Sequence, residues 1–167
     1  MSKEIKRNYL EIKSLKELIE STHCPNDFKL EVVRNPDFQL NKFFYKNVGK
    51  NYYWIDRLAW SDLDWTKFIN NKNLQTYVLK NKNDFAGYFE IIYHPDNNEK
   101  EIAYFGLLEE YHKKKLGSYF LTCAIKEAFK DDISRLWLHT CSLDHENALH
   151  NYLARGMKIF KEEKIKI

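Results

Sequence analysis

The chain has 167 residues, of which 44% are hydrophobic and 16% aromatic, and this composition indicates one folded domain rather than a disordered chain. The formal net charge of +3, from 27 basic and 24 acidic residues, is too small an excess to favour a nucleic-acid-binding protein. The N-terminal segment lacks the apolar run of a signal peptide, and no apolar stretch reaches the roughly 18 residues of a membrane-spanning helix. We therefore expect a cytoplasmic protein with neither a membrane nor a nucleic-acid partner.

The cysteines predict neither disulfides nor a metal centre. Cys24, Cys123 and Cys141 are an odd number, and none of them has the CxxC spacing of a zinc site. Reduced thiols are typical of cytosolic proteins. We expect three free cysteines and no bound metal.

In chain order, the first half predicts short helices and one strand. Residues 14–19 begin with a capping-box pattern, Ser14 to Glu17, and are expected to form a short helix. Residues 28–33 have the composition of a strand. A helix is then expected from about Asp37 to Gly49, and another from about Ser61 with Asp64 at its box position. One face of the first of these helices carries Leu40, Phe43, Phe44 and Val48, and the expected buried side of the second carries Leu63, Trp65, Phe68 and Ile69.

The second half predicts a sheet. Strands are expected at about 76–79, 86–93 and 101–108, and the short polar turns between them indicate an antiparallel meander. A helix at 116–129, a strand at 133–140, a helix at 145–154 and one or two last strands after 157 follow. A strand–helix–strand unit requires a parallel pair. The predicted fold class is therefore α/β (α+β), with a mixed, largely antiparallel central sheet and helices on both faces.

The stretch YHKKKLGS, residues 111–118, comes where a strand gives way to the helix at 116–129. The N-terminus of a helix has unpaired backbone N–H groups and a partial positive charge, so it can bind an anion such as a phosphate. The lysines add positive charge, and Gly117 allows the backbone to approach a ligand closely. The alternative interpretation is a lysine-rich loop that only keeps a turn soluble.

From residue 101 onward the sequence resembles the GNAT superfamily of N-acetyltransferases. The family has the motif R/Q-x-x-G-x-G/A in the loop that holds the diphosphate of acetyl-CoA. Gly117 matches the second glycine, whereas His112 replaces Arg or Gln and Lys115 replaces the first glycine. We expect a helical φ at Lys115, which would let its side chain point outward or reach a phosphate.

A second block, residues 135–163, is similar to the family pattern N-x-x-A-φ-x-x-Y-x-x-x-G-F, in which φ is an apolar residue. Ala148, Leu149, Tyr152 and Gly156 match it, and His145 stands at the usual Asn position. The resemblance is good over about 76–163 and weak over the first seventy residues. It implies one domain over 1–167, with an acceptor-side segment at about 1–72 and an acetyl-CoA-binding core at about 73–163.

The resemblance implies an acetyl-CoA-dependent N-acetyltransferase that uses acetyl-CoA as acetyl donor and no metal. The pantetheine arm would lie in a gap between two diverging strands, and an N–H near Leu107 would polarise the thioester carbonyl. The residues implied in cofactor binding are Leu107, Leu108, His112, Lys113, Lys114, Lys115, Leu116, Gly117, Ser118, His145 and Asn147.

The transfer needs a base for the amine proton and an acid for the departing thiolate. Tyr152 stands at the family's acid position. Glu101 is where some members carry a glutamate base, and Glu90 on the preceding strand is the rival candidate. His139 and His145 are further candidates, because the ordinary pKa of a histidine side chain lies near neutrality. Because no partner base is evident for an acyl-enzyme at Cys141, we interpret that residue as packing.

The segment 51–65 is rich in aromatic and charged residues and corresponds to the family's acceptor side. Trp54 and Trp60 are candidates to enclose an ammonium group by cation–π contact. Asp56 or Asp62 is a candidate to pair with that ammonium, and Arg57 to bind a carboxylate. The alternative is that the tryptophans simply pack the helices onto the sheet.

The leading hypothesis is transfer of an acetyl group to a primary amine of a small molecule, an amino acid, or a peptide or protein. A non-catalytic acyl-CoA sensor or interaction module is the main alternative, because the loop motif is weakened. An RNA-binding module is disfavoured by the small net charge. A monomer and a homodimer are both compatible with the sequence.

Overall fold

The computed structural model describes residues 2–167 and contains a seven-stranded sheet with the order β2-β3-β4-β5-β6-β1-β7. All neighbouring strands are antiparallel except β5 and β6, so the prediction of a mixed, largely antiparallel sheet is confirmed. The strands are β1 (Glu4–Ile12), β2 (Phe28–Val32), β3 (Leu74–Asn81), β4 (Asp84–His94), β5 (Glu99–Leu107), β6 (Arg135–Cys141) and β7 (Lys158–Lys166). The helices are α1 (Phe38–Gly49), α2 (Asp62–Ile69), α3 (Leu116–Ala128) and α4 (Ala148–Ala154), with short 3-10 turns at Leu15–Glu17 and Glu109–Tyr111.

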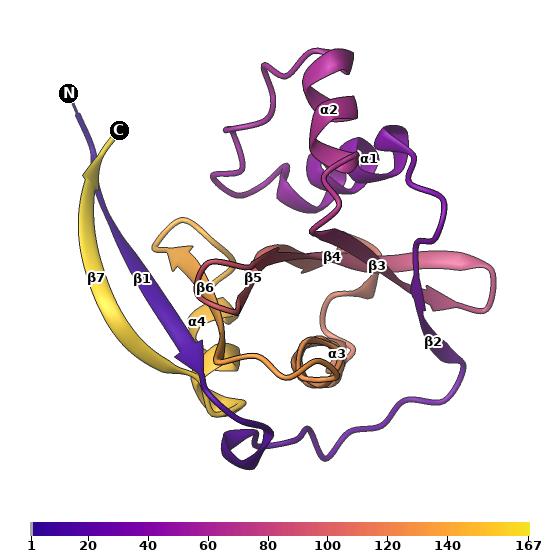
Figure 1. The fold of residues 1–167 in the computed structure, drawn as a ribbon, viewed down its shortest axis with the longest axis vertical. Helices are drawn as coiled ribbons and strands as arrows, with labels where there is room; N and C mark the ends of the chain where they lie inside the picture. The colour runs from indigo at the N-terminus through magenta and orange to yellow at the C-terminus, as the bar shows by residue number, and fades with distance from the viewer. Residues whose placement is uncertain (1) are drawn as a thin grey trace.

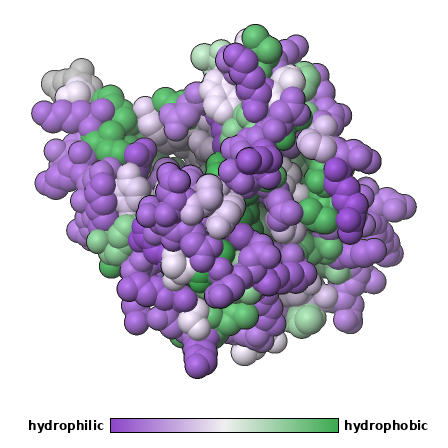
Figure 2. Space-filling view, in the orientation of Figure 1, coloured by the Kyte–Doolittle hydropathy of each residue, from purple (hydrophilic) through white to green (hydrophobic). Residues whose placement is uncertain are grey.

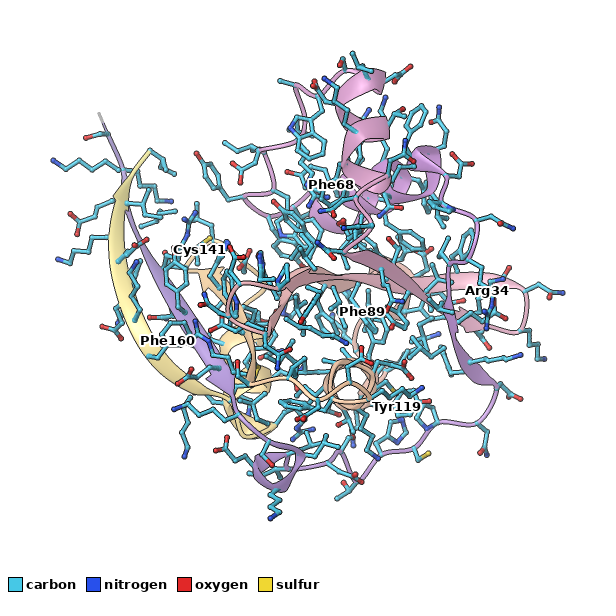
Figure 3. All side chains as sticks on the ribbon, in the orientation of Figure 1. Arg34, Phe68, Phe89, Tyr119, Cys141 and Phe160 are labelled. Carbon is cyan, nitrogen blue, oxygen red and sulfur yellow. The ribbon has the colours of Figure 1, made fainter. Side chains whose placement is uncertain are left out.

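The sheet carries helices on both faces, α1 and α2 on one and α3 and α4 on the other (Figure 1). Adjacent residues of β4 contact the helices on opposite sides of the sheet, because side chains alternate between the faces of a strand. Tyr88 stacks on Phe44 of α1 with ring centroids 4.8 Å apart. Phe89 lies between the sheet and α3 (Figure 3), 5.3 Å from Phe120. A large aromatic core therefore fixes the central strands that position the site.

The capping box predicted for α2 is confirmed, but only part of the face predicted to be buried is buried. Ser61 and Asp64 form the predicted capping box, and Trp65 is 1% exposed. Leu63 is 62% exposed, so the prediction that it is buried is wrong, and Phe43 of α1 is also 43% exposed. The two helices cover only the β3–β5 half of the sheet and pack on each other, which leaves their outer sides in solvent.

The main departure from the prediction is β1, which the sequence did not indicate. It lies between β6 and β7 and buries Leu10 and Ile12 completely. Its polar residues weaken the apolar alternation, and its partners are more than 100 residues away in the chain. The helix expected at 14–19 is only the turn Leu15–Glu17, and the last strand is single. Lys3 and Ile167 pair through backbone hydrogen bonds of 2.8 and 2.9 Å, so the ends of the described chain are adjacent (Figure 1).

The surface agrees with the hydrophilic composition. Figure 2 shows hydrophilic residues over most of the face in view, with hydrophobic residues in smaller patches between them. Over residues 2–167, every helix is too short or too polar to cross a membrane.

Candidate active site

The site begins where the two parallel strands separate. β5 and β6 pair only through Glu99, Lys100 and Glu101, opposite residues 135–137. In its antiparallel pairing with β4, β5 has a register shift that leaves Ala103 as an extra residue between Ile102 and Tyr104, two positions after Glu101, the last residue paired with β6. A bulge bends a strand, so β5 turns away from β6 at this point. Beyond the bulge, the facing backbone edges of both strands are left without a strand partner.

A cavity of about 770 Å³ occupies this gap, a volume within the range of small-molecule sites. Its walls come from the loop at 19–23, the segment 52–56, the end of β5, the start of α3, and the region from the end of β6 to α4. Cys141, at the end of β6, lies between the β1–β7 ribbon and β5 in Figure 3 and lines the cavity. Segments distant in the sequence thus meet around one ligand-sized space.

The first turn of α3 opens into this cavity. No side chain caps the helix, whose N-cap residue is Lys115. Lys115 has a left-handed backbone, with φ 57° and ψ 24°, and Lys113 also has a positive φ of 62°. The expectation of a helical φ at Lys115 is therefore wrong, because the turn into α3 needs the left-handed conformation that the family's glycine adopts freely. A non-glycine residue pays about 1–2 kcal/mol in that conformation.

Gly117 is not required by packing inside the protein. A Cβ atom placed on it would contact only the Asn151 Nδ2, at an ordinary 3.6 Å. Asn151 donates a hydrogen bond of 3.0 Å from that nitrogen to the Gly117 carbonyl and so ties α4 to the loop. Lys113 and Lys115 line the cavity, and among residues 2–167 neither takes part in an ion pair. An uncapped helix start, an open glycine and two free ammonium groups fit a diphosphate.

The structure brings most of the predicted cofactor-binding residues together, but not Leu108 or Lys114. Leu108 is 6% exposed, and its N–H donates to the Ala86 carbonyl at 2.8 Å, so its amide is already used in the sheet. The Lys114 ammonium lies over the Tyr111 ring, 5.2 Å from its centroid and outside the cavity lining. The predicted residues that do line the cavity are Leu107, His112, Lys113, Lys115, Leu116, Gly117, Ser118, His145 and Asn147.

His112, which replaces the family's Arg or Gln, links this loop to β5. Its Nε2 lies 3.0 Å from the Leu107 carbonyl oxygen, and its ring packs edge-on against His145 with centroids 5.3 Å apart. The His145 Nδ1 accepts a hydrogen bond from the Asn147 N–H at 3.1 Å. These contacts fix the end of β5 against the segment that precedes α4.

Of the predicted catalytic residues, only Tyr152 lines the cavity. Burial raises the pKa of its hydroxyl, which therefore keeps its proton at neutral pH. Glu101 lies outside the lining and contacts the His94 Nε2 at 3.0 Å. Glu90 is fully buried and bonded to Arg57. Both carboxylates are engaged by protein groups away from the cavity, so the geometry favours neither as base.

His139 is the histidine that β6 presents to the cavity beyond the last β5–β6 pair. Desolvation and the charge of Arg7 lower the pKa of its imidazole, while Glu101, Asp144 and Asp56 oppose that change. The side chain is therefore neutral, and able to accept a proton, at pH 7. Burial raises the pKa of the neighbouring Cys141 thiol, which leaves that thiol a poor nucleophile.

On the acceptor side, Trp54 and Asp56 line the cavity, whereas Arg57 and Trp60 do not. The Arg57 Nη1 donates to both Glu90 oxygens, at 2.8 and 3.0 Å. Burial raises the pKa of Glu90, and the arginine opposes that rise. Arg57 is thus occupied inside the protein and not free to bind a substrate carboxylate. Its guanidinium lies within 5.7 Å of five ring centroids, those of Tyr45, Trp60, Trp65, Phe68 and Tyr104, and Figure 3 labels Phe68 in this cluster.

Several lining residues were not predicted from the sequence. Arg7 reaches the cavity because β1 pairs with β6, with Arg7 opposite Cys141. The loop at 19–23 lies against α3, where the Ser21 N–H donates to the Thr122 Oγ1 at 3.0 Å. No local pattern indicates either contact. Asn151 lies within the second motif block at a position that the family pattern leaves open.

The comparisons with known proteins agree with this geometry. Residues 37–157 match the model of the acetyltransferase (GNAT) family, and the chain belongs to that family. No curated protein matches the chain. Within residues 2–167, no cluster of three or more His, Cys, Asp or Glu side chains is arranged to hold a metal ion.

Solved structures are similar to the chain in fold. A GCN5-related N-acetyltransferase from Sphaerobacter thermophilus superposes with a TM-score of 0.73 at 10% identity, over 97% of this chain and 51% of that one. A conserved protein of unknown function from Staphylococcus epidermidis has a TM-score of 0.63 at 17% identity, over 98% and 61% of the two chains. The spermidine N-acetyltransferase from Vibrio cholerae, in complex with CoA and spermine, has a TM-score of 0.62 at 14% identity, over 85% and 96%. The chain thus spans about half to three fifths of the first two structures, and at these identities the likeness concerns the fold.

Proposed function

We propose that the chain is an acetyl-CoA-dependent N-acetyltransferase that transfers an acetyl group to a primary amine. The observation that carries the proposal is the cavity between β5 and β6, which ends on the uncapped first turn of α3. The diphosphate of acetyl-CoA would bind at Gly117, with Lys113 and Lys115 beside it. The pantetheine would lie along the free edge of β5 and bring the thioester toward β6.

The cavity contains a candidate base and a candidate acid for direct transfer. The amine nitrogen attacks the thioester carbon and gives up its proton to His139, directly or through a water molecule. The carbon–sulfur bond then breaks, and the departing thiolate takes the Tyr152 proton. The raised pKa of Tyr152 and the lowered pKa of His139 suit these roles at neutral pH. His139 replaces Glu101 and Glu90 as our candidate base, because they do not line the cavity.

We propose that the donor and acceptor sides come from nearly the same residue ranges as expected from the sequence. Residues from about 73 to 163 supply most of the donor side, and Trp54 and Asp56 belong to an acceptor side within about 1–72. Arg7 adds a β1 residue to the cavity, next to β6. Monomer and homodimer are both compatible with this arrangement.

The proposal is tested by two measurements on the same protein. Thermal unfolding with and without acetyl-CoA reports binding, because a ligand that binds only the folded state raises the midpoint. Release of the CoA thiol over a panel of primary amines reports transfer. Stabilisation without thiol release on any amine would favour the acyl-CoA sensor, and the absence of both responses would exclude either function.

A further inference from the structure

Two opposite charges without protein partners face the acceptor end of the cavity. Asp56 follows Trp54, which packs on Tyr104 of β5 with centroids 4.6 Å apart. Arg7 projects from β1 beside the end of β6, opposite Cys141. Within residues 2–167, neither Arg7 nor Asp56 takes part in an ion pair or in a side-chain hydrogen bond.

Arg7 lacks a partner because the nearby carboxylates are bonded elsewhere. Glu163, its cross-strand neighbour on β7, contacts the Lys161 ammonium at 2.7 Å and accepts a hydrogen bond of 3.0 Å from the Tyr9 hydroxyl. Asp144 accepts hydrogen bonds from the Thr140 hydroxyl and from the Cys141 N–H. The protein thus engages both carboxylates with its own groups, although Asp144 also lines the cavity, and leaves the guanidinium without an ion-pair partner.

The Nε of Arg7 is buried, whereas its two terminal guanidinium nitrogens are accessible and take part in no hydrogen bond within the described part of the chain. A carboxylate matches the planar fork of a guanidinium and can accept two parallel hydrogen bonds from it. The role expected for Arg57 from the sequence, which the Glu90 ion pair prevents, is thus open to Arg7.

We propose that the acceptor is an amine that also carries a carboxylate, with Arg7 binding the carboxylate and Asp56 lying beside the amine. This inference rests on the proposed function, since it assigns the acceptor class of the same site. Lys113 and Lys115 belong to the loop at the start of α3 and are assigned to the diphosphate. A carboxyl-free amine would leave the Arg7 guanidinium unpaired in the cavity.

The test uses matched pairs of acceptors, each an ω-amino acid or α-amino acid and the alkylamine of equal length without the carboxylate. The wild-type chain should prefer the carboxylated member by about 10- to 150-fold in kcat/KM, the range for a charge-assisted hydrogen-bonded pair. Measured at a pH above the His139 acid limb of both proteins, Arg7→Met should abolish the preference by slowing only the carboxylated member, and Arg7→Lys should restore part of it. Asp56→Asn should slow both members of each pair alike.

Lys6→Met is the control, because Lys6 is adjacent to Arg7 on β1 but pairs with Glu162 at 3.0 Å outside the cavity lining. It removes one positive charge and should leave the preference unchanged. An unchanged thermal shift with acetyl-CoA in Arg7→Met would show that the donor side is intact. A wild-type preference for the carboxyl-free amines, or an equal loss for both members in Arg7→Met, would overturn the inference.

Acceptor binding to the CoA-saturated chain, followed by ligand NMR line broadening, separates this inference from the proposed function. If carboxylated amines bind the wild-type chain, bind Arg7→Met at least tenfold more weakly, and are never acetylated, then the transferase proposal fails and the assignment of Arg7 stands. If amines are acetylated but the carboxylate changes neither binding nor rate, then the assignment fails and the transferase stands.

Discussion

Substitution of Gly117 by alanine separates binding of the donor from folding of the chain. Gly117 is the second residue of α3, and an added methyl group would contact only the Asn151 amide nitrogen, at 3.6 Å. The protein therefore has room for it. Alanine is up to about 1 kcal/mol better than glycine inside a helix, which for a chain of this size corresponds to a rise of about 2–4 °C in Tm. Because Gly117 lies in the first turn, we expect an unchanged or slightly higher Tm.

The same methyl group would stand where a diphosphate has to approach the backbone amides. Loss of one charge-assisted hydrogen bond costs about 1.5–3 kcal/mol, so the Kd for acetyl-CoA should rise about 10- to 150-fold. Isothermal titration calorimetry gives the Kd, and thermal unfolding of the ligand-free variant gives its stability. Gln39→Ala is the matched control, because Gln39 is the second residue of α1, exposed and outside the cavity lining. A Gly117→Ala variant that binds acetyl-CoA as tightly as wild type would refute the placement of the diphosphate at α3.

Four further substitutions test other parts of the account. Lys115→Gly should raise the unfolding free energy by up to about 1 kcal/mol in thermal or urea unfolding, because release of left-handed strain outweighs the flexibility of glycine in the unfolded chain; a loss of stability would contradict the backbone conformation. Arg57→Met should destabilise the chain by about 3–5 kcal/mol at pH 7 by leaving Glu90 buried and unpaired. Because burial raises the pKa of Glu90 above its unfolded value, the folded state of this variant binds the proton more tightly, and the loss should shrink as the pH falls toward 4.5; a loss that does not change with pH would count against the buried charge. His139→Gln should lower kcat by about 10²–10⁴-fold and remove the acid limb of the pH profile of kcat/KM. In the wild type this limb lies below pH 6.5, because the pKa of His139 is lowered. An intact limb in the variant would exclude His139 as base. Tyr152→Phe should lower kcat by a similar factor without weakening acetyl-CoA binding, and an unchanged kcat would remove Tyr152 as the acid.

Arg7 and His139 should also be coupled. The positive charge of Arg7 lowers the pKa of His139, so Arg7→Met should move the acid limb of kcat/KM to higher pH, whereas Lys6→Met should leave it in place. A limb at the same pH in Arg7→Met would show that the two side chains do not share the site.

Local patterns predicted much of the fold. The meander of β3, β4 and β5 and the capping box of α2 depend on signals only a few residues apart. β1 was not predicted, because its strand character comes from pairing with β6 and β7 at the other end of the chain. The position of Arg7 was hidden for the same reason. Sequence periodicity does not encode which distant strands become neighbours.

Much of the donor side of the site was predictable from the sequence, as much of the fold was, but the acceptor side was not. The glycine-containing start of α3 follows from helix chemistry and the family motif, and Gly117 and Tyr152 line the cavity. Arg57 and Asp56 are neighbours in the sequence, but one is buried against Glu90 and the other lines the cavity. The sequence around Arg57 does not indicate whether its side chain is buried or lines the cavity. Its burial depends on Glu90, a buried carboxylate 33 positions away.

The central claim is that the start of α3 binds the diphosphate while the pantetheine lies between β5 and β6. Titration of the ¹⁵N-labelled chain with CoA, and separately with pantetheine, tests it most directly through the backbone amide shifts. With CoA, the largest shifts should fall on the amides of Leu116, Gly117 and Ser118 and on the end of β5, and pantetheine should shift only the β5 amides. Shifts confined to other regions, or none at saturating CoA, would contradict the account.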